Sequence, residues 1–396
     1  FLFFNYLETK NPLSLFFSIL FAFLSMVTYH SYKALTVLLN LVIFLQNYRP
    51  FFHNLIKGFQ KQKIIYLSVF LFFIPIGVIY TSHFVFGAGM TRTKMVFLSN
   101  DFEYRILLIE KLKYFGYYFY DYTLLPFFWF KRFLDYFTPN FYLYSGLELT
   151  VPHHPGVGVT GISVFTLFIL GLYFLLFSKL KTNLDPKIKT FLLAWVFFGF
   201  FPASIANNVQ QPQRSLCVLP SILLIAALGF YFLTKLPHKK LIKQVLIIAL
   251  FLLFIFDYVR FADYYLLHYP KELAEYRHYG WKEAYEYLEP IKDNYQIIYV
   301  DPRYGSIGRT TYSVPYLYFL FYSQYDTSIF QQDPLRQQHL ADYANFKFLD
   351  IDWQVIEKNP NYLYVGSPWS FPTSIKPIHV INFPNGTPAL YVIKSN

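Results

Sequence analysis

The residues best suited to chemistry in this sequence gather where polar segments meet long apolar stretches. Tyr29, His30 and Lys33 lie between two apolar runs near the start of the chain, and Arg214 opens another. Arginine offers a planar fork of hydrogen-bond donors and lysine a compact positive charge, so both suit an anion such as a lipid phosphate. The predicted binding residues are Arg214, Lys33, Arg92, His30, His153, His154, Tyr29 and Glu148.

These residues also have a plainer interpretation. Long cationic side chains near the ends of membrane helices reach toward phospholipid headgroups, and for Lys33 this alternative stays open. His153 and His154 belong to VPHHPGVG at Val151–Gly158, where two prolines and two glycines oppose a simple helix and indicate an interfacial turn. Arg214 favours a binding role, because it is predicted on the outer side of a membrane, where positive charge is scarce.

The motifs of soluble enzymes are missing from the sequence. It contains no GxSxG, HExxH, P-loop or GxGxxG pattern. The single cysteine, Cys217, excludes a disulfide within the chain and a cysteine zinc cluster. We therefore predict no metal and no cofactor, and the lack of a DNA or RNA recognition motif predicts no nucleic-acid partner.

The composition indicates a polytopic membrane protein. Of the 396 residues, 55% are hydrophobic, 23% are aromatic and only 14% are charged. A soluble domain carries about 25% charged residues. The net charge of +11 fits a membrane protein whose cytoplasmic loops collect Lys and Arg.

Seven apolar stretches are long enough, or nearly so, to cross a bilayer. The first two are separated by a few residues and should form a tight helical hairpin. The predicted spans are Pro12–Thr28, Tyr32–Gln46, Ile64–Thr81, Val159–Phe177, Phe191–Ile205, Ser215–Leu233 and Val245–Phe261.

Lysine and arginine set the predicted orientation. They are concentrated in the loops after the second, fourth and sixth spans, which therefore should be cytoplasmic. Alternation then places the Tyr29–His30 turn, the loop 83–158, the short loop 206–214 and everything after about Asp263 on the outer side. We expect a multi-pass protein of the cell (plasma or inner) membrane.

Two domains follow from this arrangement. Residues 1–262 form a predicted transmembrane domain of about seven spans, with a long outer loop at 83–158. Within this loop, Arg105–Tyr122 has the spacing of an amphipathic helix, and the aromatic cluster Tyr114–Phe130 is typical of lipid anchoring. Residues 263–396 form a predicted small extracytoplasmic α/β domain. Its predicted elements are helices at 281–288 and 314–322 and strands at 296–301, 346–353, 375–381 and 389–393.

Four segments resemble a known family. They are Phe21–Leu39, Met90–Asn100, Tyr136–Gly158 and Leu192–Gly229. In their order and placement they are similar to the C-terminal portion of a GT-C type membrane glycosyltransferase. The group is family 39, which is protein-mannosyltransferase-like and includes the lipid A aminoarabinose transferases.

Within these segments, Lys33 stands where the family often has an arginine. Arg92 takes the place of a recurring arginine after the third span, and Arg214 belongs to a recurring Arg-Ser-Leu. The family's Gly-Asp is replaced by Gly146-Leu147, with Glu148 as a possible substitute.

The resemblance implies a helical GT-C-like fold and transfer of a sugar from a polyprenyl-phosphate donor to a lipid, glycan or protein acceptor at the outer face. In the family, an aspartate in the first outer loop acts as the general base. That loop would precede Phe1, so we expect the chain to be a fragment. The residues of this chain would then bind and position the donor. Arg214 and Lys33, and next Arg92, would contact the phosphate, and His30, His153 and His154 would line the cavity.

Two other functions remain open. A transporter for a lipid-linked substrate is disfavoured, because the centres of the spans lack obvious ionisable residues and no halves repeat. A non-catalytic membrane protein that binds glycan or a partner is the other alternative, because no residue here matches the family's base.

Overall fold

The structure of this protein is a computed structural model. It describes residues 2–28, 30–82, 97–112, 117–144, 158–177, 184–207, 212–235, 240–306, 311–332 and 342–395. The chain forms two compact units, a helical unit at Phe1–Tyr258 and a sheet unit at Val259–Asn396. The sequence placed the domain boundary slightly later, after residue 262.

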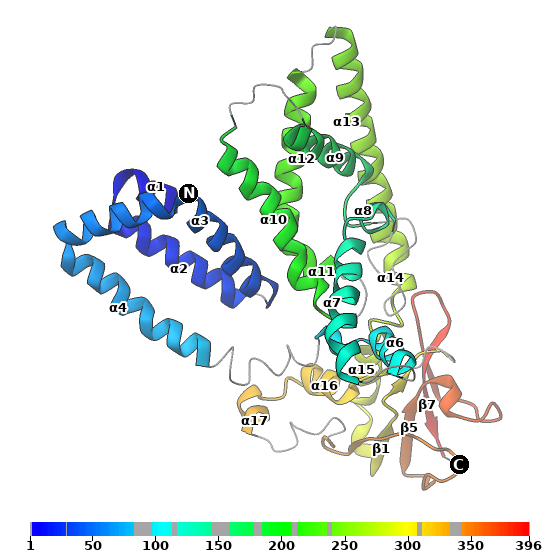
Figure 1. The fold of residues 1–396 in the computed structure, drawn as a ribbon. Coiled ribbons are helices and arrows are strands. Elements are labelled where there is room, and N and C mark those ends of the chain that lie inside the picture. Colours follow the sequence, from blue (N-terminus) through cyan, green and yellow to red (C-terminus); the bar gives the residue numbers. More distant parts are fainter. Residues whose placement is uncertain are drawn as a thin grey trace. The chain divides into compact units, whose positions relative to one another are not determined.

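The helical unit contains a helix at each of the seven predicted span positions (Figure 1). Five are at least 18 residues long and apolar enough to cross a membrane, when α12 is counted together with the turns before it as Pro212–Lys235. These helices indicate a membrane-associated protein. α2 and α9 have only 17 and 16 residues. They are therefore shorter than the 18 residues that the other five reach. Of the seven predicted spans, five therefore have the required length. The seven helices are α2 (Pro12–Thr28), α3 (His30–Lys61), α4 (Lys63–Tyr80), α9 (Ile162–Phe177), α10 (Pro186–Ser204), α12 (Leu219–Lys235) and α13 (Lys240–Asp263).

The ends and bends of these helices follow from local sequence. α3 continues beyond the predicted end at Gln46 but leaves helical geometry at Asn47. Pro50 explains this kink, because its ring clashes with the carbonyl four residues earlier and it has no N–H to donate. α10 begins at Pro186 because the Asp185 carboxylate accepts the Lys187 N–H at 2.8 Å.

The predicted outer loop at 83–158 proves to be largely helical in its described part. It contains α6 (Phe102–Leu112), α7 (Tyr117–Asp135) and α8 (Pro139–Leu143). The predicted amphipathic helix at Arg105–Tyr122 is therefore represented by parts of two helices. The prediction of lipid-anchoring aromatics is only partly right. Phe127 and Phe130 are exposed, whereas Phe128 is buried and the Trp129 indole N–H donates to Ser204 Oγ at 3.0 Å.

Glycines allow α9 and α12 to cross closely. A Cβ at Gly171 would overlap the Ile225 carbonyl oxygen, and a Cβ at Gly229 would overlap the Leu167 carbonyl oxygen. Small residues at a crossing let two backbones approach, which is a common basis for helix association in membranes. α13, by contrast, has no buried residue among those described.

The sheet unit is built on five strands in the order β4-β1-β5-β7-β6. β1 pairs in parallel with β4 and β5, and β7 pairs antiparallel with β5 and β6. A separate ribbon of β2 (Arg303–Tyr304) and β3 (Thr311–Tyr312) follows β1. The strands of the sheet are β1 (Ile297–Val300), β4 (Phe346–Phe348), β5 (Tyr362–Gly366), β6 (His379–Asn382) and β7 (Pro388–Lys394).

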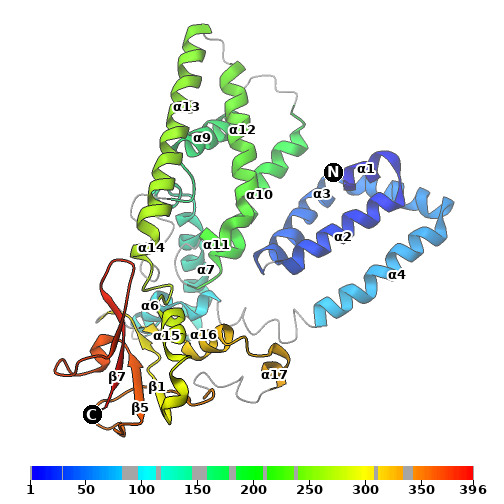
Figure 2. The same ribbon diagram turned by 180° about the vertical axis from the view of Figure 1, so that it is seen from behind.

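Two apolar layers cover the sheet, and Figure 2 gives the reverse view. Ile298 and Val300 face the layer that includes α15 (Trp281–Leu288) and α16 (Pro315–Tyr322). Tyr299 faces the other layer, as expected from the two-residue period of a strand. The predicted helices at 281–288 and 314–322 are confirmed, as are the strands at 296–301 and 389–393. The strand predicted at 346–353 ends at Phe348, and the one predicted at 375–381 begins at His379.

Candidate functional site

Two of the predicted binding residues, Lys33 and Arg214, have described side chains. His30 is the first residue of α3. Tyr29, Arg92, Glu148, His153 and His154 lie outside the described residues. The geometry of the site is therefore built from Lys33, Arg214 and the helices that hold them.

Lys33 lies in the first turn of α3 and is half-buried. The start of a helix presents unpaired N–H groups and the positive end of the helix dipole. An anion there would meet both these groups and the ammonium of Lys33. Lys33, Val37, Asn40 and Phe44 recur at i, i+4, i+7 and i+11, so they lie on one face of the helix.

Arg214 lies in α11 (Pro212–Ser215), next to a short 3₁₀ turn at Leu216–Val218. Its Nη1 donates to the Asn207 carbonyl at 2.6 Å. The turn is fixed to α10, because the Trp195 indole N–H donates to the Cys217 carbonyl at 3.0 Å and the Cys217 thiol contacts the Gly199 carbonyl at 3.3 Å. The same turn contacts α3. The elements that carry Lys33 and Arg214, α3 and α11, thus both contact this turn.

A cavity of about 430 Å³ lies between α2, α3 and α4. Its wall is mainly apolar and aromatic. Asn40 and Thr36 contribute polar groups, but the Asn40 amide donates to the Thr36 carbonyl and the Thr36 hydroxyl pairs with Ser25. The cavity is lined by Phe3, Leu15, Ser18, Ile19, Ala22, Phe23, Met26, Thr36, Val37, Asn40, Phe44, Phe51, Phe73, Ile76 and Gly77.

This cavity and Lys33 share one face of α3. Val37, Asn40 and Phe44 belong both to the cavity wall and to the stripe that begins at Lys33. From Val37 to Phe44 the helix extends for about 10 Å at 1.5 Å per residue, and Phe51 continues the wall beyond the kink at Asn47. The arrangement pairs a cation at one helix end with a long apolar wall, which matches an amphiphile with an anionic head.

Gly77 leaves open space in this wall. A Cβ at Gly77 would meet no heavy atom within 4 Å. A second hollow of about 580 Å³ along α4 shares Phe73 and Gly77 with the cavity. The sequence analysis treated α4 as an ordinary span, although a single small residue within a run of Phe and Ile could have marked this space.

A buried ion cluster holds α6 against α7. Arg132 Nη2 lies 3.4 Å from Asp101 Oδ2 and 2.9 Å from Glu103 Oε2. The side chains of Arg132 and Asp101 are only 6% and 3% exposed. Asp101 Oδ1 accepts the backbone N–H groups of Glu103 and Tyr104 at the start of α6. Because Asp101 is engaged through both oxygens, we assign this cluster to stability.

Asp257 has a different partner from the one expected. Asp257 and Arg260 are three residues apart in the sequence, the spacing of an ion pair on one helix face. Instead, its Oδ2 accepts the Ser163 backbone N–H at 2.8 Å and the Ser163 hydroxyl at 2.7 Å. The carboxylate therefore caps the start of α9, where the helix dipole favours negative charge.

No protein-family model matches the chain, and no curated protein or solved structure matches it significantly. The geometry of the two units is therefore the basis for the functional argument.

Proposed function

We propose that this protein is a membrane glycosyltransferase that moves a sugar from a polyprenyl-phosphate donor to an acceptor at the outer face. The observation that carries the proposal is the shared face of α3, on which Lys33 adjoins the apolar cavity. A polyprenyl phosphate has a long hydrocarbon tail and an anionic head, so it complements both features. The resemblance to GT-C type transferases supplies the reaction.

In this proposal, each group has a defined part. The cavity holds isoprene units of the donor, and Lys33 and the first turn of α3 face its phosphate. Arg214 adds a fork of donors from α11, which stabilises the charge that grows on the phosphate as it leaves. These residues bind and orient the donor, and none of them is proposed to remove the proton of the acceptor hydroxyl.

Filling the cavity should block the donor without harming the fold. Gly77→Leu places a side chain in open space and replaces glycine with a better helix former. We expect KM for a polyprenyl-phosphate sugar to rise about tenfold, the equivalent of about 1.4 kcal/mol of lost binding, with melting temperature unchanged or higher. The measurement is release of polyprenyl phosphate from a panel of such sugars by membranes that contain the full chain.

Ile79→Phe is the matched control, because Ile79 is an exposed residue of α4 that does not line the cavity. It should leave KM unchanged. A normal KM for Gly77→Leu would place the lipid tail elsewhere. Movement of the intact donor across the membrane without release of polyprenyl phosphate would favour the transporter.

A further inference from the structure

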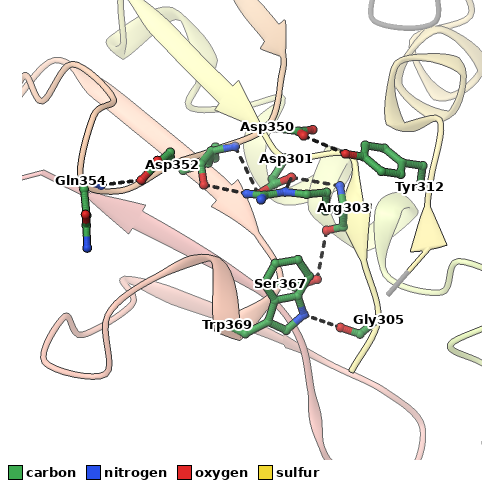
Figure 3. Close-up of polar contacts among 10 residues, drawn as sticks. Asp301, Arg303, Gly305, Tyr312, Asp350, Asp352, Gln354, Ser367 and Trp369 are labelled. Carbon is green, nitrogen blue, oxygen red and sulfur yellow. Dashed lines mark hydrogen bonds and ion pairs between the residues drawn. The ribbon is translucent and has the colours of Figure 1, made fainter. Parts of the chain in front are cut away.

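The carboxyl ends of the three parallel strands in the sheet unit carry a group of polar and aromatic side chains (Figure 3). Ligands of open α/β sheets bind in the crevice beyond these ends. The side chains that follow the strands are Asp301 and Arg303 after β1, Asp350 and Asp352 after β4, and Ser367 and Trp369 after β5.

Arg303 is fixed by a buried carboxylate. Its Nε and Nη2 donate to the two oxygens of Asp301 at 3.0 and 2.7 Å, and Nη2 also donates to the Ile351 carbonyl at 2.7 Å. Asp301 is fully buried, whereas the Arg303 side chain is 26% exposed. Nη1 makes no hydrogen bond to the described residues, so Arg303 presents an oriented donor at the surface.

Trp369 is fixed beside Arg303. The indole N–H donates to the Gly305 carbonyl at 2.6 Å, and the guanidinium carbon lies 5.3 Å from the centroid of the ring. Ser367 supports the same segment, because its hydroxyl donates to the Arg303 carbonyl at 3.2 Å. The indole is half-buried, which leaves part of it open to a ligand.

Carboxylates complete the group on its exposed side. Asp350 Oδ2 accepts the Tyr312 hydroxyl at 2.8 Å, and Asp352, two residues further along the chain, accepts the Gln354 backbone N–H on Oδ1 at 3.0 Å. The hydrogen bond to Asp301 raises the pKa of Arg303, and the charge of Asp350 contributes to this shift. Asp301, Asp350 and Asp352 outnumber the single guanidinium, so the local charge disfavours an anionic ligand.

We propose that this edge of the sheet binds a carbohydrate that is neutral or amino-substituted. Sugar hydroxyls donate and accept hydrogen bonds, so they can pair with Asp350 and the open edge of Arg303. The C–H face of the sugar ring packs on Trp369. This inference is independent of the proposed donor site, because it concerns a soluble sugar and the sheet unit alone.

The test is titration of the full-length protein in lipid nanodiscs, followed by saturation-transfer NMR. The probes are three trisaccharides. The first consists of β-linked glucosamine units, the second is cellotriose, and the third consists of galacturonic acid units. We expect the first two to bind and the acidic one to bind at least about tenfold more weakly, because like charges oppose it. Asp350→Asn should weaken binding of the glucosamine trisaccharide more than that of cellotriose.

Trp369→Ala should weaken binding of both by about tenfold or more, as for other aromatic anchors. Phe321→Ala and Asp293→Asn, which change exposed residues outside the group, should bind normally. Trp369→Phe keeps a ring and should bind within about threefold of the original protein. The proposal is overturned if no trisaccharide binds or the acidic one binds best. It is also overturned if the Trp369→Ala protein binds the trisaccharides normally. A loss of affinity in Trp369→Phe as large as that in Trp369→Ala would overturn it as well.

Discussion

Replacement of Arg214 by alanine is expected to lower release of polyprenyl phosphate from a lipid-linked sugar by about 10²-fold or more, the usual cost of removing one donor that stabilises developing charge. The side chain is half-buried in α11, which contacts the same 3₁₀ turn as α3. Without the Arg214 guanidinium, the departing phosphate would be stabilised only by Lys33 and the first turn of α3. The effect should fall mainly on kcat, because the charge on the phosphate grows as the sugar departs.

Arg214→Lys separates charge from geometry. Lysine keeps the positive charge but loses the planar fork, so this variant should retain part of the activity. Arg49→Ala is the control, because Arg49 is an exposed arginine in the distant part of α3. Equal amounts of each variant should reach the membrane. Full activity of a well-inserted Arg214→Ala protein would remove Arg214 from the site.

Arg132→Met is expected to give the largest loss of stability, about 3–5 kcal/mol, because it leaves Asp101 charged and buried without its partner. The guanidinium also lies 5.0 Å from the Phe128 ring, so packing is lost with the charge. The measurement is thermal unfolding of the purified protein in detergent, followed by tryptophan fluorescence.

Lys131→Met is the matched control, since Lys131 is the exposed neighbour on the same helix, and it should change the melting temperature little. Glu103→Gln should also cost little, about 0–1 kcal/mol, because Glu103 is half exposed. Adding Asp101→Asn to Arg132→Met should recover part of the loss. An Arg132→Met protein as stable as the Lys131→Met protein would show that the cluster contributes nothing.

The sequence predicted elements best where their apolar residues repeat at a single period. Trp281, Ala284, Tyr285 and Leu288 have helical spacing, and all four are buried along one side of α15. β5 was missed because Tyr362–Gly366 is buried on both faces and therefore shows no alternation. A central strand between β1 and β7 has this continuous character.

The aromatic cluster Tyr114–Phe130 differs from its prediction for another reason. Its residues were assigned to lipid, but Phe128 and Trp129 pack within the helical unit. Sequence does not distinguish these cases in a membrane protein, because a lipid-facing surface is as apolar as a core. The cavity between α2, α3 and α4 was also out of reach, since it results from tertiary packing. Lys33 and Arg214 could be selected from the sequence by their residue types. The packing of α3 and α11 against the same turn could not be predicted.

The most direct test of the account is photo-crosslinking of the full-length protein in nanodiscs with a polyprenyl phosphate that carries a diazirine on its tail. We expect saturable labelling of α2, α3 and α4 at cavity residues such as Val37 and Phe73. Unlabelled polyprenyl phosphate should compete, neutral polyprenol should compete poorly, and Lys33→Ala should weaken labelling. Labelling confined to exposed helices such as α13, or equal competition by polyprenol, would show that the cavity does not bind a polyprenyl phosphate.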